Sequence, residues 1–355
     1  MTPSTVPAAT PVTLTPLLGM PEVCPGDDLA EVVVRALAAN GIRLADGDVL
    51  VVSSKIASKA LGLTASAQDR SEAVLRQSRR VVAERDTPLG VTRVVEAVAG
   101  PVMAAAGVDA SNTGAADVVL LLPADPDEVA RALRARIAQL LPGAEVGVIL
   151  SDTAGRPWRV GQTDFALGAA GVHLVDDLRG AHDGDGRELS VTERCVGDEI
   201  AAAADLVKGK NAGVPVAHVR GLAPPAPPSA GTPGARSLVR TGPTDWFGSG
   251  RVEAVRASLG VEAGTELARK VGIPSALPEP PATRIARARR VALLGVEGVS
   301  ASTGPEEVVL QGEDAFTLGV AASRLVVALH GEGLVGRVER LPATGRQLQA
   351  RVKTT

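Results

Sequence analysis

Apolar runs along this chain are short and rich in β-branched residues, a pattern typical of buried strands. We expect strands at five places: 48–54, 117–122, 146–150, 214–219 and 290–296. Apolar positions that recur every three or four residues predict helices. One is expected directly after Asp27 and Asp28, and others within 126–141, 192–207, 244–267 and 314–330. Residues 66–86 are charged and predicted to be helical or irregular. Because strands and helices mix without strict alternation, the pattern predicts a mixed α/β (α+β) fold.

Proline and glycine divide the chain into parts. Residues 1–13 read as a disordered lead. Residues 222–236, LAPPAPPSAGTPGAR, have the composition of a linker. We therefore expect a first domain over 14–222, a linker over 223–243 and a small C-terminal α/β domain over 244–355.

Composition excludes several classes of function. The net charge is −3, and the aromatic residues are three Phe and two Trp with no Tyr, so a nucleic-acid partner is not expected. Two cysteines are too few for a disulfide framework. No apolar stretch reaches the length of a membrane span, and the N-terminus lacks the pattern of a signal peptide. We expect a cytoplasmic protein that does not bind membranes.

The segment 146–162, VGVILSDTAGRPWRVGQ, is the strongest candidate for a site. Asp152 and Thr153 follow a buried strand, where a carboxylate and a hydroxyl can supply oxygen ligands to Mg²⁺ or Mn²⁺. Arg156 and Arg159 come next, and guanidinium groups suit phosphates and carboxylates. The alternative is a strand followed by a glycine turn and a solvated basic loop.

Three other segments carry weaker signals. Asp109 lies in GVDASN, where the residues alone favour an ordinary Asx-turn over a metal ligand. Ser54 and Lys59 follow a predicted strand and could meet a triphosphate, although no GxxxxGK[ST] loop occurs in the chain. The basic loop 208–213, KGKNAG, could cradle phosphates or could simply end a helix.

Several motifs together resemble the coenzyme F420-0:L-glutamate ligase family. The family pattern TDTxGRxWRxGQxxxAxGxAG corresponds to SDTAGRPWRVGQTDFALGAAG at 151–171. Further agreement, in the same order along the chain, comes from LLGMPEVCPGDDLAEVV, GDVLVVSSKIASKALG, GVDASNTG and DGDGRELSVTERCVGDEIAAAADLVKGKNAGVP. The resemblance covers about residues 14–222 and is closest to the ligase half of the actinobacterial two-domain form. It implies the family's mixed α/β fold and a homodimer.

The resemblance also implies roles for individual residues. Asp109, Asp152 and Thr153 correspond to ligands of a divalent metal, Mg²⁺ or Mn²⁺, with K⁺ as a further candidate cation. A second set corresponds to residues near GTP: Met20, Pro21, Glu22, Val23, Ser54, Lys59 and Asn112. Arg156 and Arg159 are candidates for holding substrate carboxylates or phosphate.

The resemblance implies an amide ligase that uses GTP to add L-glutamate, once or several times through γ-linkages, to coenzyme F420-0. Residues 244–355 resemble a shortened nitroreductase-like domain, and they lack the Arg-Arg-Ser-Val-Arg-like segment that binds flavin phosphate, so no flavin is expected. Two alternatives stay open: a metal-dependent phosphoryl-transfer enzyme with another acceptor, and a non-catalytic partner subunit.

Overall fold

The computed structural model describes residues 11–354, apart from 112, 114–116 and 223–232. The chain forms two compact units, Met1–Gln77 with Ala97–Arg240 and Ser78–Glu96 with Thr241–Thr355. The second unit therefore includes a segment that interrupts the first unit in sequence. The predicted mixed α/β fold is confirmed. The domain limits inferred from the sequence stay a prediction.

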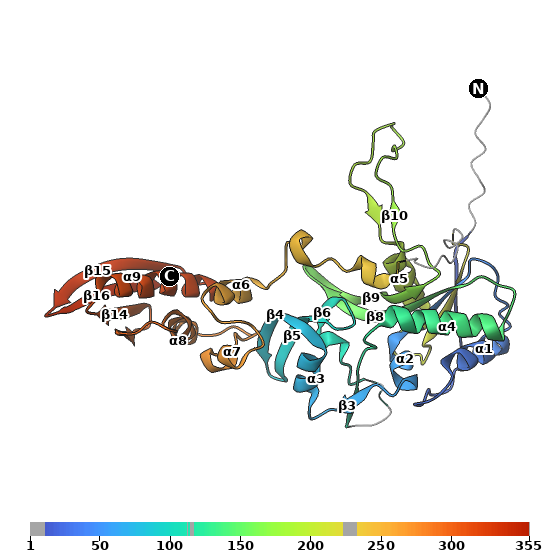
Figure 1. The fold of residues 1–355 in the computed structure, drawn as a ribbon, viewed down its shortest axis with the longest axis horizontal. Coiled ribbons are helices and arrows are strands. Elements are labelled where there is room, and N and C mark those ends of the chain that lie inside the picture. The colour runs from blue at the N-terminus through green and yellow to red at the C-terminus, as the bar shows by residue number, and fades with distance from the viewer. Residues whose placement is uncertain (1–10, 112, 114–116, 223–232, 355) are drawn as a thin grey trace. The chain divides into compact units, whose positions relative to one another are not determined.

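A five-stranded sheet forms the centre of the first unit (Figure 1). Its strands lie in the order β1 (Thr13–Pro16), β12 (Val216–Arg220), β2 (Val49–Ser53), β8 (Gly147–Arg156) and β9 (Arg159–Ala170). The pair β2 and β8 is parallel, and the other neighbours are antiparallel. Strand β2 and the first half of β8 are apolar and buried because helices cover both faces of the sheet there.

Alternate residues of the central strands point to opposite sides of the sheet. Leu50 and Leu150 pack against helices α1 (Leu29–Ala39) and α4 (Pro126–Leu140). Val51 and Ile149 belong to the core on the other side, which includes α5 (Val196–Lys208). The unit is thus a three-layer sandwich whose sheet is held on both faces.

The predicted starts of α1 and α4 are confirmed, and an aspartate caps the N-terminus of each helix. Asp28 accepts hydrogen bonds from the backbone N–H groups of Ala30 and Glu31, and Asp125 caps α4 ahead of Pro126. The remaining elements of the first unit are short: α2 (Ser54–Ala60), β3 (Thr64–Ser66), α3 (Arg70–Arg76), β6 (Val102–Ala104), η1 (Ala105–Gly107), β7 (Val118–Leu120), β10 (Asp176–Asp177), β11 (Glu193–Arg194) and η2 (Ala235–Leu238).

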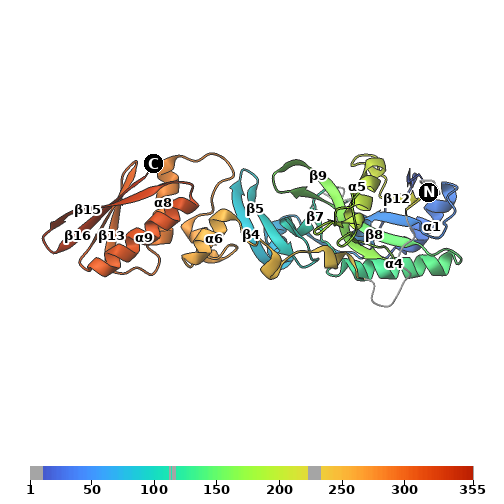
Figure 2. The same cartoon turned by 90° about the horizontal axis from the view of Figure 1, so that it is seen from above.

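The second unit contains a four-stranded antiparallel sheet with helices on one face (Figure 2). Its strands lie in the order β13 (Val299–Thr303), β14 (Glu307–Gly312), β16 (Gln347–Thr354) and β15 (Gly336–Thr344). Helices α8 (Pro281–Ala292) and α9 (Ala315–Gly331) pack against it. The unit also includes the strands β4 (Ser78–Thr87) and β5 (Gly90–Ala97), and the helices η3 (Gly242–Thr244), α6 (Arg251–Ser258) and α7 (Glu266–Val271).

Two sequence predictions are wrong in this unit. The strand expected at 290–296 falls on the end of α8 and the turn that follows it, because a short apolar run reads alike in a strand and in a buried helix face. Residues 78–86 form a strand rather than a helix or an irregular segment. The alternation of this strand is hidden in the sequence because one inward position is Glu84, which is buried and paired with Arg93 at 3.2 Å.

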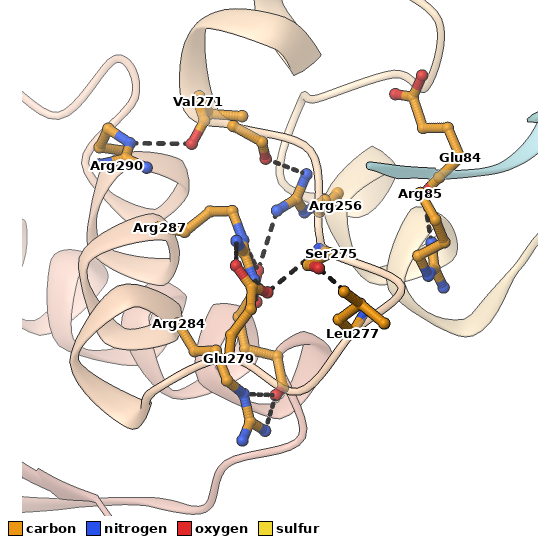
Figure 3. Close-up of polar contacts among 12 residues, drawn as sticks. Glu84, Arg85, Arg256, Val271, Ser275, Leu277, Glu279, Arg284, Arg287 and Arg290 are labelled. Atoms are coloured by element: carbon orange, nitrogen blue, oxygen red, sulfur yellow. Dashed lines mark hydrogen bonds and ion pairs between the residues drawn. The ribbon is translucent and has the colours of Figure 1, made fainter. Parts of the chain in front are cut away.

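A buried cluster of charges joins the helices of the second unit (Figure 3). The carboxylate of Glu332 forms ion pairs with the guanidinium groups of Arg256 and Arg287, with N···O distances of 2.9 Å and 2.5 Å. All three side chains are nearly inaccessible to solvent. Arg287 also pairs with Glu279 at 2.7 Å. Arg284 donates to the backbone carbonyl of Glu332. The two arginines in ion pairs balance the two glutamates, Arg284 adds one positive charge, and the cluster ties α6 and α8 to the end of α9.

A separate buried carboxylate, Asp48, lies at the start of β2 in the first unit. It accepts from Arg220 at 2.7 Å and is 2.8 Å from His218. Burial alone would raise the pKa of Asp48, but the hydrogen bonds from Arg220 and His218 outweigh it and lower the pKa.

Among the described residues, no helix has both the length and the hydropathy needed to cross a membrane.

We expect Asp48→Asn to lower the free energy of unfolding by about 1.5–3 kcal/mol at pH 7, the range for hydrogen bonds to charged groups. A carboxyl whose folded pKa is lowered stabilises the fold above its unfolded pKa, and this contribution disappears as the pH falls through the folded value. The difference between Asp48→Asn and the unaltered protein should therefore shrink below about pH 4. Urea unfolding at pH 7 and pH 3 measures it, and a difference that stays constant would contradict the role assigned to Asp48.

Candidate functional site

A pocket lies where the parallel strands β2 and β8 end side by side. Ser53 pairs with Ser151 at this point. The chain leaves β2 directly into α2, whereas β8 continues into a hairpin with β9. Carboxyl ends of neighbouring parallel strands are a common place for ligand sites. The cavity has a volume of about 690 Å³ and is lined by Met20, Pro21, Glu22, Val23, Ser53, Lys55, Ile56, Lys59, Ser151, Asp152, Thr153, Asp164, Asp205, Lys208, Gly209, Lys210, Asn211, Gly213, Val214 and Pro215.

One wall of the pocket consists of the N-terminal loop and α2. Glu22 forms an ion pair with Lys59, and Val23 anchors the loop in the hydrophobic core. Ser54 is buried at the start of α2 and does not belong to the pocket lining. The predicted nucleotide residues Met20–Val23 and Lys59 thus meet at one pocket, although they are far apart in the sequence.

Asp109 is connected to the pocket through Lys55. The Lys55 ammonium lies 2.6 Å from the Asp109 carboxylate, and Asp109 also accepts from the backbone N–H of Ser111 at 2.7 Å. The Asx-turn considered from the sequence therefore exists beside the ion pair. Burial alone would raise the pKa of Asp109, but the hydrogen bonds from Lys55 and Ser111 outweigh it and lower the pKa. The predicted nucleotide residue Asn112 lies outside the described residues.

Asp152 lines the pocket without a cationic partner. In the part of the chain that the structure describes, no lysine, arginine or histidine forms an ion pair with it. Burial raises the pKa of Asp152 to about 6, and the like charges of Asp164 and Asp109 add to the effect. An ionised Asp152 is therefore electrostatically unfavourable by itself, and a bound cation would relieve that cost.

Thr153 belongs to a hydrogen-bonded network whose side chains also line the pocket. Its hydroxyl lies 2.6 Å from Asp164, the residue directly opposite it on β9. Asp164 pairs with Lys208 at 2.7 Å, and both side chains are buried. Ser151 bridges the two, while Lys210 reaches Thr153 from the pocket side at 2.5 Å. The network fixes the end of β8 against α5.

Arg156 and Arg159 are placed differently from the other predicted residues. The structure shows a β-hairpin instead of the basic loop expected there, because β8 continues to Arg156 and β9 begins at Arg159. Both arginines are exposed and do not belong to the pocket lining. Trp158 between them has a positive φ of 59°. Their proposed contact with substrate stays a prediction.

A divalent cation fits the donor groups at this pocket. Within the described ranges, no cluster of three or more His, Cys, Asp or Glu side chains is arranged to hold a metal ion. Asp109, Asp152 and Thr153 provide two carboxylates and one hydroxyl, which would leave coordination positions to water and phosphate, as Mg²⁺ commonly requires. The unpaired charge of Asp152 is the observation that favours a cation here.

Sequence reasoning missed Asp164 and its partner Lys208. Asp164 lies within the motif 151–171 but is assigned no role from the sequence, so its pairing with Thr153 is not among the predictions. The turn itself can be read from the sequence, because Pro157 favours a turn after Arg156. The pairing of residues 153 and 164 cannot, because it depends on a β-bulge in β9 between Arg159 and Gln162. Lys208 is predicted only as part of a flexible basic loop, yet its side chain is buried.

More than half of the chain matches a known protein family. The family model of F420-0:gamma-glutamyl ligases matches residues 18–221. A coenzyme F420:L-glutamate ligase of Haloarcula marismortui is 41% identical over 228 residues, which span 57% of this chain and 84% of the relative. A relative of the same name from Methanopyrus kandleri is 38% identical over 246 residues, which span 64% of this chain and 93% of the relative. The chain therefore belongs to the F420-0:gamma-glutamyl ligase family.

Proposed function

We propose that this chain joins L-glutamate to coenzyme F420-0 in an amide ligation driven by GTP and assisted by Mg²⁺ or Mn²⁺. The observation that carries the proposal is a single pocket in which the unpaired carboxylate Asp152 lies among lysine side chains. Such a mixture suits a triphosphate with its cation better than a neutral ligand. The description of the family supplies F420-0 as the acceptor, and the names of the relatives supply L-glutamate.

The chemistry requires activation of a carboxylate. One oxygen of the terminal carboxylate of F420-0 attacks the γ-phosphorus of GTP, the bond to GDP breaks, and an acyl phosphate forms. The glutamate amine then attacks the acyl carbon, phosphate leaves, and the nitrogen loses a proton. Neither step needs a covalent bond to the protein, so its contribution is to position the reactants and to neutralise charge.

The lysines of the pocket are suited to that contribution. Lys55, Lys59 and Lys210 line the cavity, and each can donate to phosphate oxygens once released from its present partner. A divalent cation held by Asp109, Asp152 and Thr153 would neutralise phosphate charge during transfer. Exclusion of water from the pocket by the substrates strengthens these interactions because it lowers the local dielectric.

Other parts of the proposal rest on the family resemblance. We propose that Arg156 and Arg159 hold a carboxylate or phosphate of the acceptor, that K⁺ is a further candidate cation, and that several glutamates can be added by γ-linkage. A homodimer and a cytoplasmic location also belong to the proposal. The C-terminal unit is expected to bind no flavin.

Phosphate release tests the reaction class. We expect release from GTP only when F420-0 and L-glutamate are both present, with ATP a poorer donor. Release that needs glutamate but not F420-0 would indicate another acceptor. Absence of release under all conditions, from a protein that unfolds cooperatively, would favour a non-catalytic subunit.

A further inference from the structure

Asp164 and Lys208 form an ion pair that the reaction above does not explain. The side-chain exposures are 5% and 4%, and the Asp164 carboxylate lies 2.7 Å from the Lys208 ammonium. A buried ion pair is often no more stabilising than apolar residues of the same size. Both residues line the pocket and form hydrogen bonds with two other lining residues, Ser151 and Thr153, which suggests a purpose other than stability.

The hydrogen bonds of this network have determined directions. An ammonium can only donate, so the Asp164 Oδ2 and Ser151 Oγ atoms accept from Lys208 at 2.7 Å each. The Ser151 hydroxyl proton then goes to Asp164 Oδ2 at 2.8 Å. Asp164 Oδ1 is left to accept the single hydroxyl proton of Thr153 at 2.6 Å.

These directions fix the orientation of the Thr153 hydroxyl. Because the Thr153 hydroxyl proton points to Asp164, the lone pairs of Thr153 Oγ1 are available on the pocket side. A cation already lies there, since the Lys210 ammonium is 2.5 Å from Thr153 Oγ1. The pocket side of this hydroxyl therefore presents an acceptor and not a donor.

We propose that Asp164, oriented by Lys208, is a positioning residue that turns the lone pairs of Thr153 toward a divalent cation in the pocket. This inference rests on the proposed function, and it assigns Asp164 and Lys208 an indirect role, through Thr153. Partners that accept hydrogen bonds from metal-ligating groups typically affect metal affinity by about 10-fold to 100-fold.

The substitution Asp164→Asn should reverse the hydrogen bond at Thr153. Lys208 still needs an acceptor, so the amide oxygen of the introduced asparagine turns to Lys208 and its NH₂ group turns to Thr153. The Thr153 oxygen then accepts from the amide, and its proton is directed into the pocket, where it repels a cation. Replacing Lys208 by Met in the same protein removes this requirement and lets the amide oxygen return to Thr153.

The experiment measures binding of Mn²⁺ alone by electron paramagnetic resonance, without substrates. We expect Asp164→Asn to weaken Mn²⁺ binding by about 10-fold to 100-fold. Thr153→Val should weaken it similarly, and the double variant should equal Thr153→Val, because Asp164 acts through Thr153. Lys208→Met added to Asp164→Asn should restore part of the affinity. Asp48→Asn is the matched control, a buried carboxylate with cationic partners outside the pocket, and it should leave Mn²⁺ binding unchanged.

Unfolding of each variant in urea, with no metal present, separates loss of fold from loss of affinity. Additive losses for Asp164→Asn and Thr153→Val, or no effect of Asp164→Asn in a folded protein, would overturn the positioning role and leave the proposed function intact. Failure of the unaltered protein to bind Mn²⁺, with or without GTP, would contradict the metal site of the proposed function and this inference with it.

Discussion

Asp152→Asn is expected to reduce ligase turnover by about three orders of magnitude, the several kcal/mol that a metal ion contributes to charge stabilisation. The substitution keeps the shape of the side chain but removes one negative charge from the proposed ligand set. Asp152 is the residue to change because it lines the pocket and no cationic side chain of the described part pairs with it. Steady-state kinetics in GTP, glutamate and F420-0 measures the loss.

Asp205→Asn is the matched control for this prediction, since Asp205 lines the same pocket and loses the same charge. It should change turnover only a few-fold. Equal losses in the two variants would mean that general charge in the pocket matters and that Asp152 is no specific ligand.

The stability of Asp152→Asn gives an independent check. Burial raises the pKa of Asp152 to about 6, so the ionised carboxylate opposes folding above that pH in the absence of metal. Asp152→Asn should therefore be as stable as the unaltered protein at pH 7.5, or more stable. The difference should vanish below about pH 4, where both folded and unfolded carboxyls are protonated.

Glu332→Gln is expected to destabilise the second unit by about 3–5 kcal/mol, the range for breaking a buried ion pair. The substitution leaves Arg256 without a carboxylate and leaves Arg287 with Glu279 alone (Figure 3). Urea unfolding followed by hydrogen exchange should show the loss of protection in α8 and α9. Both helices belong to the hydrophobic core of this unit.

Glu266→Gln is the control for Glu332→Gln, because the same substitution there removes a surface pair with Lys270 at 3.0 Å. Exposed pairs of this kind contribute about 0–1 kcal/mol. If the two variants differ by less than about 1 kcal/mol, the buried cluster does not hold the second unit together.

Much of the first unit could be predicted from the sequence because its patterns are strong. The central strands are continuous apolar runs, and α1 and α4 carry both an apolar face and an aspartate cap. The β8–β9 hairpin is harder to predict, since its exposed end has no apolar alternation. For that reason the sequence does not single out Asp164, although it contacts Thr153 directly.

The second unit is harder to predict because charged residues occupy its interior. Arg256, Arg287 and Glu332 are buried, whereas such residues usually indicate a surface. The same difficulty hides the strand that contains Glu84. Ion pairs between segments distant in the sequence leave no periodic signal, so these burial patterns emerge only from the three-dimensional structure.

Mass spectrometry of F420-0 incubated with GTP, Mn²⁺, L-glutamate and this protein is the most direct test of the proposed reaction. We expect a product heavier than F420-0 by one glutamyl residue, or by several, and no such product when GTP is omitted. Asp152→Asn should form almost none. Unchanged F420-0 after incubation with a folded, Mn²⁺-binding protein would contradict the assignment of this chain as an F420-0:L-glutamate ligase.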